Sequence, residues 1–147
     1  QGVTCHHETG EGGRSLKQVL GDESLGLKAV INLLPNTPAT RDVLNAEVFQ
    51  ALPDDAVLIN PGRGSSVVEE DLVAALEEGK LRGALLDVFQ HEPLAEDSPL
   101  WHQPRVIITP HAAAPTPVAE AADQLADNIR RIQRGEVLTG ISREHGY

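Results

Sequence analysis

Four short apolar runs that do not alternate with polar residues constrain the fold of this chain more than any other feature. A strand with one solvated face alternates between apolar and polar residues, so unbroken runs of this length are typical of strands buried on both faces. Each run stops at a proline or at a polar loop that contains proline, which ends the strand. We expect strands at residues 28–34, 57–60, 83–89 and 105–109.

Segments with helical patterns separate these runs. A short helix is expected at residues 15–20. Asn45 is a suitable N-cap for a helix that ends near residue 52. Acidic residues at positions 69–71 favour the start of another helix, which Gly79 ends. Thr37 before Pro38 also has the pattern of an N-cap followed by a first helical position.

The last predicted helix has the clearest pattern in the chain. Thr116 is its expected N-cap and Pro117 its first residue, and Gly135 follows its basic end. Apolar residues recur at the three- and four-residue spacing of one helix face. They are Val118, Ala121, Ala122, Leu125, Ile129 and Ile132.

Strands that alternate with helices or long loops indicate an α/β fold, a doubly wound parallel sheet of the Rossmann type. The length of 147 residues suits one domain, and a hydrophobic fraction of 40% allows a buried core. A formal net charge of −10 without a basic cluster argues against nucleic acid and membrane surfaces as partners. No apolar run reaches transmembrane length, and Cys5 is the single cysteine, so we expect a cytoplasmic protein without an intrachain disulfide.

The sequence Cys5-His6-His7-Glu8 contains residue types that bind metals. Its spacing matches no zinc pattern, and adjacent residues on a strand point to opposite faces. A polar loop is therefore the preferred interpretation, and no metal site is expected.

The run at 57–60 leads directly into a turn, Pro61-Gly62-Arg63-Gly64. Because glycine has no side chain, a ligand could approach the backbone of this turn closely. An arginine in that position can hold a carboxylate through two parallel hydrogen bonds. A solvated surface turn is the alternative that these residues alone leave open.

Four polar residues, Arg63, Asp87, Glu92 and His111, lie at or just after strand ends. The carboxyl ends of parallel strands gather at one edge of a sheet, where ligands bind in open α/β folds. Taken singly, Asp87 could be a buried carboxylate bonded to backbone amides, His111 a structural histidine, and Glu92 part of a solvated loop.

Taken together, these four residues offer an anion clamp, a proton donor and a carboxylate that tunes it. This set suits the interconversion of a 2-oxo acid and a 2-hydroxy acid. The hydride must come from a nicotinamide cofactor, because no protein side chain carries one.

Motifs at 33–40, 58–64, 83–94 and 109–111 resemble, in order and spacing, those of the D-isomer-specific 2-hydroxyacid dehydrogenases. The segments at 98–106 and 111–114 look most like the branch of that family that reduces glyoxylate and hydroxypyruvate. The resemblance extends from about residue 30 to the end of the chain.

The resemblance implies roles for particular residues. Arg63 would bind the substrate carboxylate and carbonyl, His111 would be the general acid in reduction, and Glu92 its partner. Asp87 would hold the nicotinamide carboxamide. The resemblance also implies a small anionic 2-oxo or 2-hydroxy acid as substrate, NADPH in preference to NAD, and a homodimer.

The cofactor would be lined by the backbone around Leu34-Pro35, Pro61-Gly62 and Ala113, together with Arg63, Asp87 and His111. Two positions depart from the family pattern. Pro61-Gly62 replaces a small or apolar pair, and Ala113-Ala114 replaces a glycine pair that is common in the wider family.

The sequence contains no G-x-G-x-x-G motif, since Gly10-Glu11-Gly12-Gly13 lacks the required spacing. We therefore expect residues 1–115 to form the C-terminal half of a dinucleotide-binding domain, and 116–147 to return as helix and tail toward a substrate domain. Such a fragment is expected to be inactive alone. A non-catalytic α/β binding or regulatory module, or an inactive relic, are the alternatives.

Overall fold

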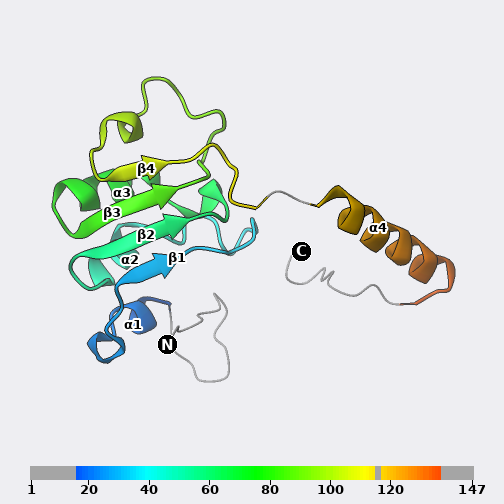
Figure 1. The fold of residues 1–147 in the computed structure, drawn as a ribbon. Helices are drawn as coiled ribbons and strands as arrows, with labels where there is room; N and C mark the ends of the chain where they lie inside the picture. Colours follow the sequence, from blue (N-terminus) through cyan, green and yellow to red (C-terminus); the bar gives the residue numbers. More distant parts are fainter. Residues whose placement is uncertain (1–15, 115–116, 137–147) are drawn as a thin grey trace.

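A computed structural model describes residues 16–114 and 117–136 of the chain and places a four-stranded sheet at its centre (Figure 1). The strands are β1 (Ala29–Ile31), β2 (Ala56–Asn60), β3 (Leu81–Leu86) and β4 (Val106–Ile108). They lie in the order β1-β2-β3-β4, and every neighbouring pair is parallel. The predicted parallel α/β sheet is therefore confirmed.

One face of the sheet is covered by α2 (Ala46–Ala51) and α3 (Glu69–Glu77), and α1 (Leu16–Leu20) packs against α2 at the edge of the same core. The strand register aligns Val30, Leu58, Ala84 and Val106 across this face, where they join the hydrophobic core. Phe49 of α2 is fully buried there. Leucine, valine and alanine make up most of the remaining core, as expected for a chain with 3% aromatic residues.

The opposite face of the sheet is largely open in the described part of the chain. Ile31, Ile59, Leu85 and Ile107 are aligned across it by the same register. Ile31 is 59% exposed and Ile107 is 62% exposed. Parallel sheets normally have both faces covered. The exposed face of this sheet therefore carries the apolar residues that are typical of a covered face.

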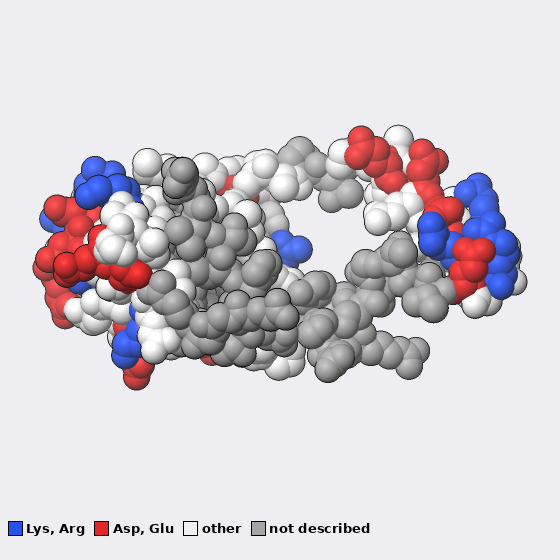
Figure 2. All heavy atoms as spheres, turned by 90° about the horizontal axis from the view of Figure 1, so that it is seen from below, with Lys and Arg blue, Asp and Glu red and all other residues white. Residues whose placement is uncertain are grey.

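The last helix, α4 (Val118–Gln133), carries the predicted apolar stripe, yet none of its residues is buried. Val118, Leu125, Ile129 and Ile132 are all exposed. Figure 2 shows basic side chains gathered toward one end of this helix and acidic ones toward the other. Arg130 and Arg131 lie in its last turn, where the helix dipole favours positive charge.

Several predicted boundaries differ from the structure. At Thr37 the side chain accepts from the Thr40 N–H at 3.2 Å, as an N-cap does, but the turn that follows does not continue into a helix. The loop after β3 contains a short 3-10 helix, η3 (Pro99–His102), and another, η1 (Glu23–Leu25), precedes β1. Pro117 is the N-cap of α4 rather than its first residue.

Some predictions fall outside the described residues, namely Thr116 as a cap and the interpretation of the Cys5-His6-His7-Glu8 segment as a polar loop. Within residues 16–114 and 117–136, no helix is long and apolar enough to cross a membrane.

Candidate active site

The arginine turn follows β2 and leads into a 3-10 helix, η2 (Gly64–Ser66), of which Arg63 is the N-cap. The Arg63 side chain is exposed, and its Nη1 donates to the Gly62 carbonyl at 2.8 Å. This single bond leaves the other guanidinium N–H groups available for a carboxylate. The turn therefore presents a cation at the carboxyl edge of the sheet.

The two glycines of this turn are also required by the packing of the neighbouring backbone. A Cβ on Gly62 would lie 2.7 Å from the Asn32 carbonyl oxygen, and one on Gly64 would lie 1.9 Å from the Phe89 carbonyl. The space on the side where a Cβ would lie is thus filled by the protein's own backbone. The arginine turn is wedged between the segments that follow β1 and β3.

Asp87 directly follows β3 and is 1% exposed. Its carboxylate accepts hydrogen bonds from the Thr109 hydroxyl, from the Ala112 N–H at 3.0 Å and from the Ala113 N–H at 2.9 Å. The Thr109 hydroxyl, followed by the two amides, holds the pKa of Asp87 below its ordinary value. Asp87 therefore fixes the loop that carries His111.

His111 lies within that loop and has a φ of 51°, in the left-handed region that residues other than glycine rarely adopt. Its Nδ1 lies 2.8 Å from Glu92 Oε2, while Glu92 Oε1 accepts from the Phe89 N–H at 3.0 Å. The bond with His111, followed by that from Phe89, holds the pKa of Glu92 low. Because an ionised Glu92 accepts from Nδ1–H, His111 Nε2 is the ring nitrogen left for a substrate.

The predicted cofactor-lining residues lie at the same edge of the sheet, after β1, β2 and β4. Leu34 and Pro35, and likewise Pro61 and Gly62, are partly buried, whereas Ala113 is exposed. The edge thus brings together all the predicted site residues: Leu34, Pro35, Pro61, Gly62, Arg63, Asp87, Glu92, His111 and Ala113.

Sequence reasoning missed four polar residues at this edge, the buried Asn32, Asn60 and Ser66 and the partly buried Thr109, which bond to the predicted site residues or to their turns. Asn32 and Asn60 were visible as polar residues inside or at the end of apolar runs, which is an unusual place for an asparagine. Ser66 and Thr109 gave no such signal.

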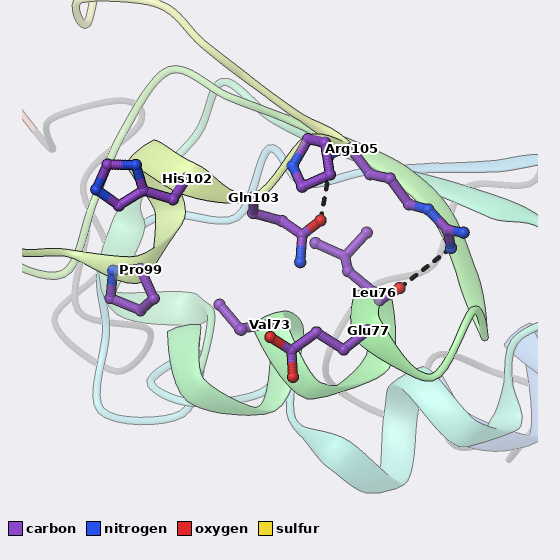
Figure 3. Close-up of a pocket in the computed structure, with 8 residues that line it drawn as sticks. Val73, Leu76, Glu77, Pro99, His102, Gln103 and Arg105 are labelled. Carbon is purple, nitrogen blue, oxygen red and sulfur yellow. Dashed lines mark hydrogen bonds between the residues drawn. The ribbon is translucent and has the colours of Figure 1, made fainter.

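A hollow of about 530 Å³ lies elsewhere, between α3 and η3 (Figure 3). Its lining includes Leu76 and Glu77 at the end of α3, and Arg105, whose Nη1 donates to the Leu76 carbonyl at 3.1 Å. Arg105 directly precedes β4, so this hollow reaches the amino end of that strand and shares no residue with the candidate site. In the described part of the chain, no three His, Cys, Asp or Glu residues are grouped as a metal would require.

The family model for the D-isomer specific 2-hydroxyacid dehydrogenase NAD-binding domain matches residues 14–113. Glyoxylate/hydroxypyruvate reductase A from Klebsiella pneumoniae subsp. pneumoniae is 50% identical over 129 residues, which are 87% of this chain and 41% of that protein. The chain thus spans less than half the length of this curated relative.

Solved structures give a consistent result. A D-isomer specific 2-hydroxyacid dehydrogenase from Xanthobacter autotrophicus Py2, in complex with NADPH and MES, has a TM-score of 0.82 at 42% identity, over 90% of this chain and 53% of that one. An NADPH-dependent glyoxylate/hydroxypyruvate reductase from Sinorhizobium meliloti, in complex with NADP and sulfate, has a TM-score of 0.78 at 38% identity, over 90% and 42%.

We expect the buried Asp87 carboxylate to make folding sensitive to acid. Its pKa in the folded chain lies below its usual value of 3.8, so the stability it contributes is present above that pH and is lost as the pH falls through the folded pKa. Asp87→Asn should lower the free energy of unfolding at about pH 6. It should also flatten the decline of that free energy toward about pH 3, as measured by urea unfolding.

Asp54→Asn is the matched control, because Asp54 is 86% exposed and pairs only with Lys80 at 2.7 Å. If Asp87→Asn and the parent lose the same unfolding free energy on acidification, Asp87 is not the source of the acid sensitivity.

Proposed function

The chain belongs to the D-isomer specific 2-hydroxyacid dehydrogenase family, and from this premise we propose that it supplies the nicotinamide-side half of a reductase for glyoxylate or hydroxypyruvate. The observation that carries this proposal is the 2.8 Å pairing of His111 with Glu92 at the sheet edge that also presents Arg63. This edge joins a proton donor, the carboxylate that orients it and an anion-binding cation.

In the proposed reaction, Arg63 holds the substrate carboxylate and places the adjacent carbonyl near His111. The His111 imidazolium, stabilised by Glu92, donates a proton from Nε2 to the carbonyl oxygen as that oxygen gains negative charge. Glu92 also fixes the ring orientation, because its other oxygen is held by the Phe89 N–H. In the reverse direction, neutral His111 accepts the proton at Nε2 from the hydroxyl as the hydride leaves.

The site is chemically suited to a nicotinamide. Asp87 Oδ1 accepts two hydrogen bonds and Oδ2 accepts one, which leaves acceptor capacity for the N–H of a carboxamide. The backbone around Leu34-Pro35, Pro61-Gly62 and Ala113 would line the same group. When bound, the reduced cofactor supplies the hydride.

We further propose NADPH in preference to NAD, because the similar structures from Xanthobacter and Sinorhizobium hold NADPH and NADP. Residues 1–115 are assigned to the cofactor-binding half, and 116–147 to the helix and tail that return toward a substrate domain. A homodimer in the cytoplasm remains our expectation for the assembled protein.

The test uses two proteins, this chain alone and a chimera in which it replaces the matching C-terminal part of the Klebsiella reductase. We expect the chimera to consume NADPH when glyoxylate or hydroxypyruvate is added, and the chain alone to show no turnover. A chimera that folds and binds NADPH without reducing either acid would favour a non-catalytic binding module or an inactive relic.

A further inference from the structure

Three buried side chains, Asn32, Asn60 and Ser66, form a cluster beneath the arginine turn, which we call the amide cluster. They are 3%, 0% and 1% exposed. Asn32 directly follows β1, Asn60 ends β2, and Ser66 ends η2. In the described residues, no buried side-chain nitrogen or oxygen lacks a hydrogen-bond partner, so the buried polar atoms of this cluster are all hydrogen-bonded.

The amide nitrogen of Asn32 is the centre of the cluster. Its two hydrogens are donated to Asn60 Oδ1 at 2.8 Å and to Ser66 Oγ at 2.5 Å. Both of these partners donate onward to the Arg63 carbonyl, Asn60 from Nδ2 at 3.2 Å and Ser66 from Oγ at 2.7 Å. A single side chain thus supports both side-chain hydrogen bonds to the Arg63 carbonyl, which also accepts from the Ser66 N–H at 3.4 Å.

The oxygens of the two asparagines face the neighbouring turns. Asn32 Oδ1 accepts from the Leu34 N–H at 3.1 Å, and Asn60 Oδ1 accepts from the Gly62 N–H at 3.2 Å. Backbone donors and acceptors on both sides therefore determine the orientation of each amide. The close approach of Gly62 to the Asn32 carbonyl places the two turns directly against one another.

We propose that Asn32 is a positioning residue that couples the turn at Leu34-Pro35 to the turn that carries Arg63. This inference rests on the proposed function, in which the first turn lines the cofactor and Arg63 holds the substrate. The Arg63 side chain has one bond to its own turn, so the place of its guanidinium depends on where the backbone is held. Removing Asn32 therefore affects both ligands, although it contacts neither.

The first test needs no activity and uses the whole 147-residue chain. Hydrogen exchange of backbone amides is measured by NMR in the parent and in Asn32→Leu. The Leu34 amide loses its acceptor directly, so faster exchange there is expected in any case. Coupling predicts that the Gly62 amide, whose own acceptor Asn60 is intact, also exchanges about tenfold faster. Exchange at Gly62 equal to the parent would overturn the inference.

Asn45→Ala is the matched control, because it removes a side chain that caps α2 by accepting from the Val48 N–H at 3.3 Å and whose other bond, to the Asp42 carbonyl, involves no side chain of the cluster. Ser66→Ala is the milder variant should Asn32→Leu fail to fold. It removes one of the two side-chain donors to the Arg63 carbonyl and is expected to speed exchange at Gly62 by a smaller factor. If Ser66→Ala changes Gly62 exchange no more than Asn45→Ala does, the proposed coupling is wrong.

The second test measures steady-state kinetics in the chimera with the Klebsiella reductase. Asn32→Leu is expected to raise the KM for NADPH and the KM for the oxo acid together, each about tenfold. Asn60→Leu should raise the KM for the oxo acid more than the KM for NADPH, because the Asn60 side chain bonds to Asn32 and to the arginine turn but not to the Leu34-Pro35 turn. A purely structural role predicts instead that both variants match Asn45→Ala in both constants, and that outcome contradicts the inference. Because the exchange measurement needs no activity, it distinguishes an absence of coupling through Asn32 from an absence of the proposed reductase activity.

Discussion

Replacing His111 by alanine is expected to lower the turnover of 2-oxo acid reduction by about 100-fold or more, the usual scale for a lost acid–base group. Without the imidazole, no side chain donates a proton to the carbonyl oxygen as hydride arrives, and water must do so. Binding of NADPH should change little. Steady-state rates in the chimera, with NADPH affinity measured separately by fluorescence, give both quantities.

The backbone at His111 calls for a second variant. Its φ of 51° strains an alanine, whereas asparagine tolerates the left-handed region. His111→Asn should therefore lose as much turnover as His111→Ala while unfolding at a higher urea concentration. His102→Ala, at an exposed histidine of η3, is the control and should retain the parent rate. An unchanged rate in His111→Asn would exclude His111 as the proton donor.

Replacing Arg63 by alanine is expected to lower kcat/KM for the oxo acid by about 100-fold, with the KM for NADPH nearly unchanged. The estimate follows from the loss of a charge-assisted, two-pronged interaction with a carboxylate, worth about 1.5–3 kcal/mol. Arg63→Lys should recover only part of this loss, because an ammonium cannot form two parallel bonds to one carboxylate.

Arg82→Ala is the matched control, since Arg82 is an exposed arginine within β3. It removes the same charge from the protein without touching the arginine turn. If Arg63→Ala keeps the parent values of KM and turnover, Arg63 does not bind the substrate.

The strands, their parallel pairing and the edge at which the site forms could be predicted from the sequence. Unbroken apolar runs are the pattern of a parallel sheet, and parallel strands place their following residues at one edge. This reasoning also brings Glu92 near His111, although it does not show the bond between them. Taken singly, Asp87 could be interpreted as a buried carboxylate bonded to backbone amides, and its bonds from the Ala112 and Ala113 amides match that interpretation.

The reason for the two glycines and the amide cluster could not be predicted in the same way. Both depend on how closely the turns after neighbouring strands approach, which no periodicity encodes. From the sequence alone, the missing side chain of Gly62 could make room either for a ligand or for the Asn32 carbonyl. Likewise, the turn at Thr37 has the residues of a helix start, but in the structure the Thr40 hydroxyl accepts from the Thr37 N–H and donates to the Thr37 carbonyl, and no helix follows.

The most direct test of the account is the rate of NADPH consumption with glyoxylate by the chimera and by its His111→Asn variant, at matched occupancy of NADPH. We predict that the chimera reduces glyoxylate and that the variant, with the cofactor still bound, is slower by about 100-fold or more. Equal rates in the two proteins, or a chimera that binds NADPH and reduces neither glyoxylate nor hydroxypyruvate, would contradict a reductase site built from Arg63, Glu92 and His111.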